Sequence, residues 1–241
     1  MQLLIRHELK EKLVLPLNYH HILQAIIYRN LNPSMGYSQF LHDSGFSFGS
    51  RSFKMFTFSL LQGKYDIVDK KIIFRDEVFF EVRSPEIFMI RMLAQNILQN
   101  GIDYGKTHIS EVEVLVGNET VEEDELYIKM ISPISVYTTD PETKKTYFYS
   151  PMDQEFAQLV NENFIRKYIA CYGVEPEGNV FIRPASVEQR DKYVTNYKNF
   201  YISGWMGVYC LYGERKHLDF LYQAGLGSRN SQGFGMFNIV Y

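Results

Sequence analysis

The sequence predicts an α+β protein with two ferredoxin-like domains in tandem, and three observations lead to this prediction. The chain has 241 residues, which suits two compact domains of roughly 120 residues better than a single one. The elements predicted for the first half follow the order β-α-β-β-α-β, which defines the ferredoxin-like arrangement. The second half repeats that order, although no residue-level repeat is visible.

Hydrophobic periodicity predicts the elements of the first domain, which we place at residues 1–123. Residues 71–83 contain two apolar runs on either side of Asp76 and Glu77, and these predict a hairpin. The other expected elements are a strand over 1–7, a helix over 17–31, an aromatic-rich apolar run over 53–61, a helix over 85–99 and a strand over 106–116.

The second domain, residues 124–241, is predicted from the same patterns. Its boundary lies near Glu123, because the acidic run EEDE at 122–125 indicates a solvated turn. The expected elements are strands over 126–137, 180–188, 193–212 and 234–241, with helices over 152–172 and 214–223.

Composition limits the functions open to this chain. With a formal net charge of -3, no overall positive field attracts nucleic acid, so an RNA-binding surface would have to be a local basic patch. The two cysteines, Cys171 and Cys210, are too few and too far apart for a disulfide framework or a C-x-x-C zinc site. No signal peptide or membrane span is expected, which favours the cytoplasm.

The densest motif is a glycine-rich segment, residues 225–235, in which four glycines surround a short polar run. Nucleotide-binding glycine loops lie between a strand and a helix, whereas here a predicted helix precedes the loop and a strand follows it. The segment is therefore either a tight structural connection or a surface that holds RNA phosphates through exposed amides and polar side chains. The residues expected to bind RNA here are Gly225, Gly227, Ser228, Arg229, Asn230, Ser231, Gly233 and Gly235.

The chain also resembles a known family. The ending AGLGSRNSQGFGMFNIV is similar to the C-terminal glycine-rich motif of the RAMP superfamily, and in particular to the CRISPR repeat-processing endoribonucleases, the sixth Cas family. Other segments resemble landmarks of that family in order along nearly the whole chain: LIRHEL, YHHILQAIIYRNL, FLHDSGF, FKMFTFSLL, SPEIFMIRMLAQNIL, ISPISVYT and PMDQEFAQLV.

The resemblance implies a catalytic set of Tyr28, His42 and Lys54. An imidazole can transfer a proton near neutral pH, so His42 is the expected general acid or base. Lys54 would stabilise charge on the phosphoryl oxygens, and Tyr28 would orient the ribose or phosphate. Without the resemblance these would be an ordinary surface histidine, a half-buried helix residue and a solvated strand end. His20 and His21 are expected to lie away from the site.

The resemblance further implies an endoribonuclease that cuts CRISPR precursor RNA within its repeats, by attack of a ribose 2′-hydroxyl that leaves a 2′,3′-cyclic phosphate and a 5′-hydroxyl. No metal-binding spacing occurs in the sequence, so cleavage without metal or other cofactor is expected. The alternatives are a non-catalytic RNA-binding subunit of a CRISPR effector complex and a ferredoxin-like metabolic or regulatory domain pair. The expected partner is repeat RNA; an effector complex and a homodimer stay open. Further basic residues expected to bind RNA are Arg183, Arg190, Lys192 and Lys198.

Overall fold

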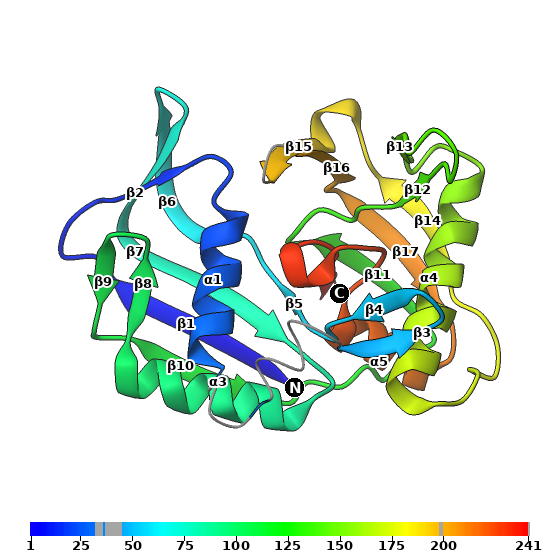
Figure 1. Cartoon of the computed structure of the whole chain (residues 1–241), viewed down its shortest axis with the longest axis horizontal. Helices are drawn as coiled ribbons and strands as arrows, with labels where there is room; N and C mark the ends of the chain where they lie inside the picture. The colour runs from blue at the N-terminus through cyan, green and yellow to red at the C-terminus, as the bar shows by residue number, and fades with distance from the viewer. Residues whose placement is uncertain (32–35, 37–44, 198–199, 241) are drawn as a thin grey trace.

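The computed structural model describes residues 1–31, 36, 45–197 and 200–240, which form two main antiparallel sheets side by side, each with two helices on one face (Figure 1). The first sheet has the strand order β10-β1-β7-β2, and β5 and β6 also pair with β7. Its strands are β1 (Gln2–Glu8), β2 (Leu13–Pro16), β5 (Thr57–Phe58), β6 (Gln62–Val68), β7 (Lys71–Arg83) and β10 (Glu113–Gly117). A small separate hairpin joins β8 (Ile102–Tyr104) to β9 (Thr107–Ile109).

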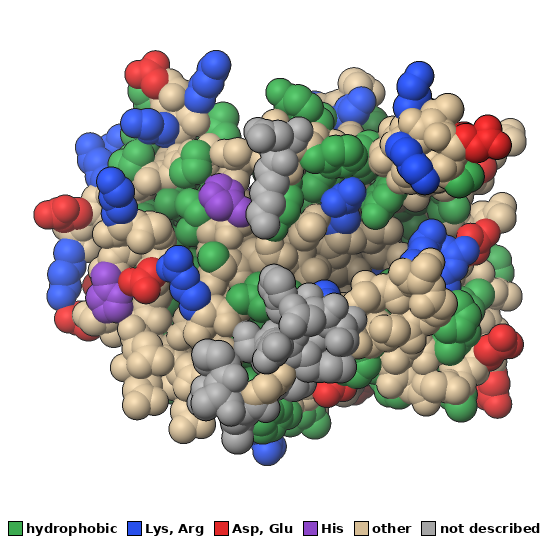
Figure 2. Space-filling view, in the orientation of Figure 1, with side chains coloured by type: hydrophobic (Ala, Val, Ile, Leu, Met, Phe, Trp, Pro, Cys, Tyr) green, Lys and Arg blue, Asp and Glu red, His purple; other side chains and the backbone are tan. Residues whose placement is uncertain are grey.

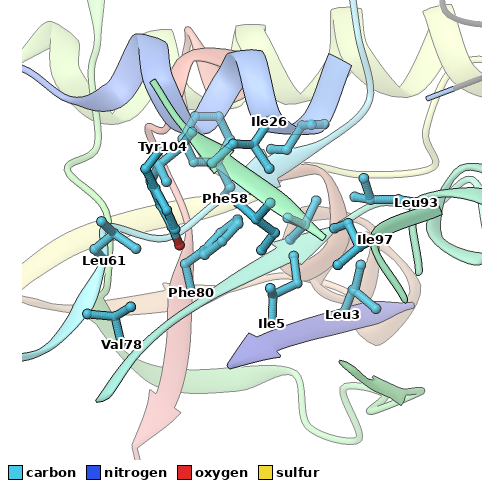
Figure 3. Close-up of a cluster of buried hydrophobic side chains, with 14 of the residues drawn as sticks. Leu3, Ile5, Ile26, Phe58, Leu61, Val78, Phe80, Leu93, Ile97 and Tyr104 are labelled. Atoms are coloured by element: carbon cyan, nitrogen blue, oxygen red, sulfur yellow. The ribbon is translucent and has the colours of Figure 1, made fainter. Parts of the chain in front are cut away.

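Helices α1 (His20–Asn30) and α3 (Ile87–Asn100) cover one face of this sheet. Alternate residues of β1 point inward, so Leu3 and Ile5 are fully buried, and they meet the apolar face of α3 that carries Leu93 and Ile97 (Figure 3). Burial of this kind stabilises a domain by about 25 cal/mol for each Å² of apolar surface removed from water. The first core thus fixes the position of α1 next to the second half of the chain.

The hairpin predicted at Asp76 and Glu77 is wrong. Residues 71–83 form one continuous strand, and the turn lies before it, at Asp69 and Lys70, which have φ angles of 48° and 61°. Asp76, with φ of 66°, lies at a β-bulge opposite Gly63, where the register between β6 and β7 shifts. A bulge interrupts the apolar alternation within a single strand, and the sequence pattern therefore resembled two strands.

The second sheet has the strand order β14-β17-β11-β18, made by β11 (Glu125–Met130), β14 (Phe181–Ser186), β17 (Val208–Tyr212) and β18 (Phe237–Val240). When only the four strands of each main path are counted along the chain, both sheets place the fourth strand beside the first and the first beside the third. Helices α4 (Glu155–Tyr172) and α5 (Arg215–Ala224) pack on one face, around Phe164 and Leu221. No helix of the described residues is long and apolar enough to span a membrane.

Residues 193–212 do not form the single strand that was predicted. They form β15 (Lys192–Tyr197), β16 (Phe200–Trp205) and β17, and the β15–β16 hairpin is a separate two-stranded sheet. The predicted strand over 126–137 likewise ends at Met130, and a second small hairpin joins β12 (Tyr137–Thr139) to β13 (Thr146–Phe148). The β15–β16 hairpin extends from the second half towards the middle of the molecule, whereas the β12–β13 hairpin lies over the second half (Figure 1).

The two halves of the chain also pack against each other. A hairpin of the first half, β3 (Phe46–Phe48) and β4 (Arg51–Phe53), lies against α4. Met55, which follows β4, is buried in the second core. The last strand of the first sheet ends at Gly117 and the first strand of the second begins at Glu125. The proposed boundary after residue 123 falls between them and stays a prediction.

Candidate functional site

A cleft of about 680 Å³ separates the segment around β4 from the glycine-rich segment. It opens on the face shown in Figure 2, which is hollowed between the two halves of the molecule. Four basic residues, Arg51, Lys54, Lys167 and Arg229, line the cleft, and none of the described residues that line it is acidic. The chain as a whole has a formal net charge of -3, so positive charge is locally concentrated here and favours an anionic ligand.

The glycine-rich segment connects α5 to β18 and includes a short 3₁₀ helix, η3 (Asn230–Gln232). At Gly235, with φ of 80°, a Cβ would lie 2.0 Å from the carbonyl oxygen of Leu226. At Gly227, with φ of 62°, it would lie 2.7 Å from the carbonyl oxygen of Ser135. Only glycine permits backbone packing this close, so these two glycines have the structural role that the sequence left as one alternative.

A buried lysine of α4 binds the backbone of the glycine-rich segment. The Nζ of Lys167 donates to the carbonyl oxygens of Gly225 and Gly227 and, at 3.0 Å, to Oδ1 of Asn230. Lys167 is 2% exposed, and burial lowers its pKa to about 7. One turn earlier on α4, Asn163 donates to the hydroxyl of Ser228. The polar run of the segment is therefore fixed at the wall of the cleft by side chains of the second half.

Side chains of α1, in the first half of the chain, also contact the backbone of the glycine-rich segment. Nδ1 of His20 is 2.9 Å from the carbonyl oxygen of Gln232, and its Nε2 is 3.0 Å from the hydroxyl of Tyr193. Gln24, one turn along α1, donates to the carbonyl oxygen of Ser231 at 2.6 Å. Burial lowers the pKa of His20 to about 4. His20 thus contacts the glycine-rich segment, because α1 runs beside that segment. That His20 lies away from the catalytic set stays a prediction.

The structure describes two of the three residues of the predicted catalytic set. Lys54 is half-buried and lines the cleft. Tyr28 is half-buried on α1, packs edge-on against Phe56 at 5.9 Å between ring centroids, and has its pKa raised to about 12 by burial. Phe56 itself lines the cleft. His42 lies outside the described residues. A common site for the three residues therefore stays a prediction.

Of the glycine-rich segment, Gly227, Ser228, Arg229, Asn230 and Ser231 line the cleft beside Lys54. Gly225, Gly233 and Gly235 do not line it.

Of the other predicted RNA-binding residues, Arg183, Arg190 and Lys192 do not line the cleft. Arg183, on the edge strand β14, donates to the hydroxyl of Tyr212, and Arg190 pairs with Glu188. Lys192 lies 5.9 Å from the ring centre of Trp205. Lys198 is outside the described residues.

Sequence reasoning missed three residues that build the cleft: Asn163, Lys167 and Arg51. A signal existed for two of them, because Asn163 and Lys167 continue the helical spacing of Phe156 and Val160 on the buried face of α4. A polar side chain at such a position must find partners inside the protein. Arg51 had no comparable signal. Among the described residues no group of three or more His, Cys, Asp or Glu side chains is placed to hold a metal ion.

The fold is shared with a solved protein whose sequence is only distantly similar. A solved structure titled "An RAMP protein binding different RNA substrates" superposes with a TM-score of 0.83 at 22% identity, covering 100% of both chains. The predicted tandem ferredoxin-like class is thereby confirmed.

The family model described as "CRISPR associated protein Cas6, C-terminal" matches residues 117–239, half of the chain. Within that class, this chain therefore belongs to the Cas6 family. The "CRISPR-associated endoribonuclease Cas6 1" of Methanocaldococcus jannaschii is 27% identical, over 92% of this chain and 86% of the relative. A solved "CRISPR associated protein Cas6" has a TM-score of 0.78 at 25% identity, over 100% of this chain and 99% of the other.

Proposed function

We propose that this chain is an endoribonuclease that cuts CRISPR precursor RNA within its repeats to give guide RNAs. Its membership of the Cas6 family and the name of the archaeal relative support this proposal. The observation that carries it is that Lys54 and the polar run of the glycine-rich segment line one cleft, in which four side chains are basic and no described side chain is acidic. A cleft of this charge suits a phosphodiester backbone.

The proposed reaction is internal transesterification. The ribose 2′-hydroxyl attacks the adjacent phosphorus, the bond to the 5′-oxygen of the next nucleotide breaks, and a 2′,3′-cyclic phosphate and a 5′-hydroxyl remain. His42 serves as general acid or base, and the ammonium of Lys54 stabilises charge on the phosphoryl oxygens.

Tyr28 is the third member of the proposed catalytic set. Since burial raises its pKa to about 12, the phenol keeps its proton at neutral pH and acts as a hydrogen-bond donor to ribose or phosphate.

The glycine-rich segment is the proposed binding element. Lys167 holds the carbonyl oxygens of Gly225 and Gly227, and so keeps the polar side chains between Gly227 and Gly233 along the cleft. The proposed partner is repeat RNA, with transfer of the product to an effector complex and association as a homodimer as later steps. The domains, 1–123 and 124–241, would each supply one wall of the cleft, and the proposed location is the cytoplasm.

The test is cleavage of the cognate repeat by purified protein in excess chelator. Cutting at one position, with a 2′,3′-cyclic phosphate on the upstream fragment, is expected, because the proposed charge stabilisation comes from Lys54 and needs no divalent ion. A strict need for added magnesium or manganese would refute the metal-free mechanism. Tight RNA binding without any cleavage would instead favour a non-catalytic RNA-binding subunit.

A further inference from the structure

Aromatic side chains from two small hairpins meet at the edge of the cleft. The ring centroids of Tyr137 on β12 and Phe148 on β13 are 5.5 Å apart, and Phe148 lies 6.2 Å from Phe200 on β16. Phe200 is 42% exposed, and the other two rings are half-buried. Figure 2 shows hydrophobic side chains gathered over these hairpins. Clustered rings in contact with water usually indicate a binding surface.

An arginine of the glycine-rich segment joins this aromatic cluster to the cleft. The guanidinium carbon of Arg229 lies 4.7 Å from the ring centre of Tyr137 and 5.4 Å from that of Phe200. Arg229 is held in place by its Nη1, which donates to Oε1 of Gln232 at 3.1 Å. Because Tyr137 and Arg229 both line the cleft, the rings and the basic cleft form one continuous surface.

The chemistry of this surface identifies the kind of ligand. The cleft carries four basic side chains and no acidic one among its described residues, so the ligand is a polyanion. The rings favour flat aromatic groups on the same ligand, because such groups stack on aromatic side chains. Single-stranded nucleic acid offers both, whereas a duplex keeps the faces of its bases inside the stack.

We infer that Tyr137, Phe148, Phe200 and Arg229 form a stacking surface for unpaired bases of the RNA that the cleft holds. This inference rests on the proposed function and adds that the repeat is single-stranded where it crosses the β12–β13 and β15–β16 hairpins. The bases stack on the solvent-accessible parts of these rings beside Arg229, while their phosphates face Arg51 and Lys54 across the cleft.

The test compares two adjacent aromatic residues of β16. Phe200 contacts the cluster, whereas Tyr201 is 70% exposed and points to the other face of the hairpin, because successive residues of a strand alternate. The probe is cognate repeat RNA with a single 2′-deoxy nucleotide before the cleavage site. Phe200→Ala should weaken its affinity by about 5- to 100-fold. Tyr201→Ala should change it less than about 2-fold.

A second measurement uses the same RNA as a duplex. When the same RNA is annealed to its complement, its bases are no longer available, so wild-type protein and Phe200→Ala should bind it equally weakly. Equal affinity of wild type and Phe200→Ala for the single strand, or an equal loss in Tyr201→Ala, would overturn the stacking surface. In that case wild-type cleavage would leave the proposed function standing. Absence of both binding and cleavage in the wild type would refute the function itself.

Discussion

Close packing of the glycine-rich segment predicts that glycine-to-alanine substitutions at Gly235 and at Gly173 lower the unfolding free energy by different amounts. Gly235 and Gly173 both have left-handed φ angles, 80° and 74°. A Cβ at Gly173 meets nothing within 4 Å, whereas a Cβ at Gly235 would lie 2.0 Å from the carbonyl oxygen of Leu226. Gly173→Ala should therefore cost only the conformational penalty, about 1 kcal/mol of unfolding free energy.

Gly235→Ala carries the same penalty and a steric one. The overlap with the backbone at Leu226 requires the chain to shift, and overpacking of this kind costs about 1–3 kcal/mol more. The expected total is about 2–4 kcal/mol. The shift would also break the 2.8 Å bond from the amide of Leu226 to the carbonyl oxygen of Gly235, so affinity for repeat RNA should fall as well.

Equilibrium urea unfolding of the two variants measures the difference, and binding of uncleavable repeat RNA measures the effect on the cleft. Gly173→Ala should bind RNA as the wild type does, because Gly173 ends α4 and does not line the cleft. Equal destabilisation by both substitutions, with normal RNA affinity in both, would refute this account of the segment.

Three further predictions follow from the same structure. Arg83 is 2% exposed and donates hydrogen bonds to Glu81, Asn238 and the carbonyl oxygen of Phe237. Arg83→Leu should lower the unfolding free energy by about 3–5 kcal/mol in urea melts. The control, Arg215→Leu, removes an exposed ion pair and should lower it by at most about 1 kcal/mol. Burial lowers the pKa of His7 to about 4, so the unfolded chain takes up a proton below about pH 6.5 while the native state does not. The unfolding free energy should accordingly fall as the pH decreases from about 6.5 to 4. In His7→Phe the slope of unfolding free energy against pH should be shallower by the equivalent of about one bound proton. An unchanged slope would contradict the lowered pKa of His7. His42→Ala should slow single-turnover cleavage by about 10²- to 10⁴-fold with repeat affinity near wild type, and a wild-type rate would move the active site elsewhere.

The fold was largely predictable because most of its elements obey one simple period. The strand at residues 1–7 alternates, and the helix over 85–99 repeats its apolar residues at helical spacing; both occur close to the predicted positions as β1 and α3. The errors occurred where backbone irregularity altered the pattern. The bulge at Asp76 resembled a turn, and the run 193–212 contained an extra hairpin that its continuous aromatic composition did not reveal.

The cleft was less predictable, since long-range contacts build it. Glycines at 225–235 and the lysine at 54 could be identified from motifs, but nothing local indicated that they face each other. Lys167 could have been suspected from its place on the apolar face of α4, whereas its bonds to Gly225 and Gly227 depend on how α4 and α5 pack. The aromatic cluster around Arg229 requires two hairpins to meet, which a single sequence does not encode in any local pattern.

Cleavage by internal transesterification is tested most directly with one modified substrate. A single 2′-deoxy substitution immediately upstream of the scissile phosphate removes the proposed nucleophile and leaves most backbone and base contacts in place. Cleavage should stop while binding persists, because the phosphates supply much of the affinity, and the modified RNA should inhibit cutting of unmodified repeat competitively. Continued cutting at that phosphate would mean that water attacks instead, and it would contradict both the metal-free mechanism and the role proposed for His42.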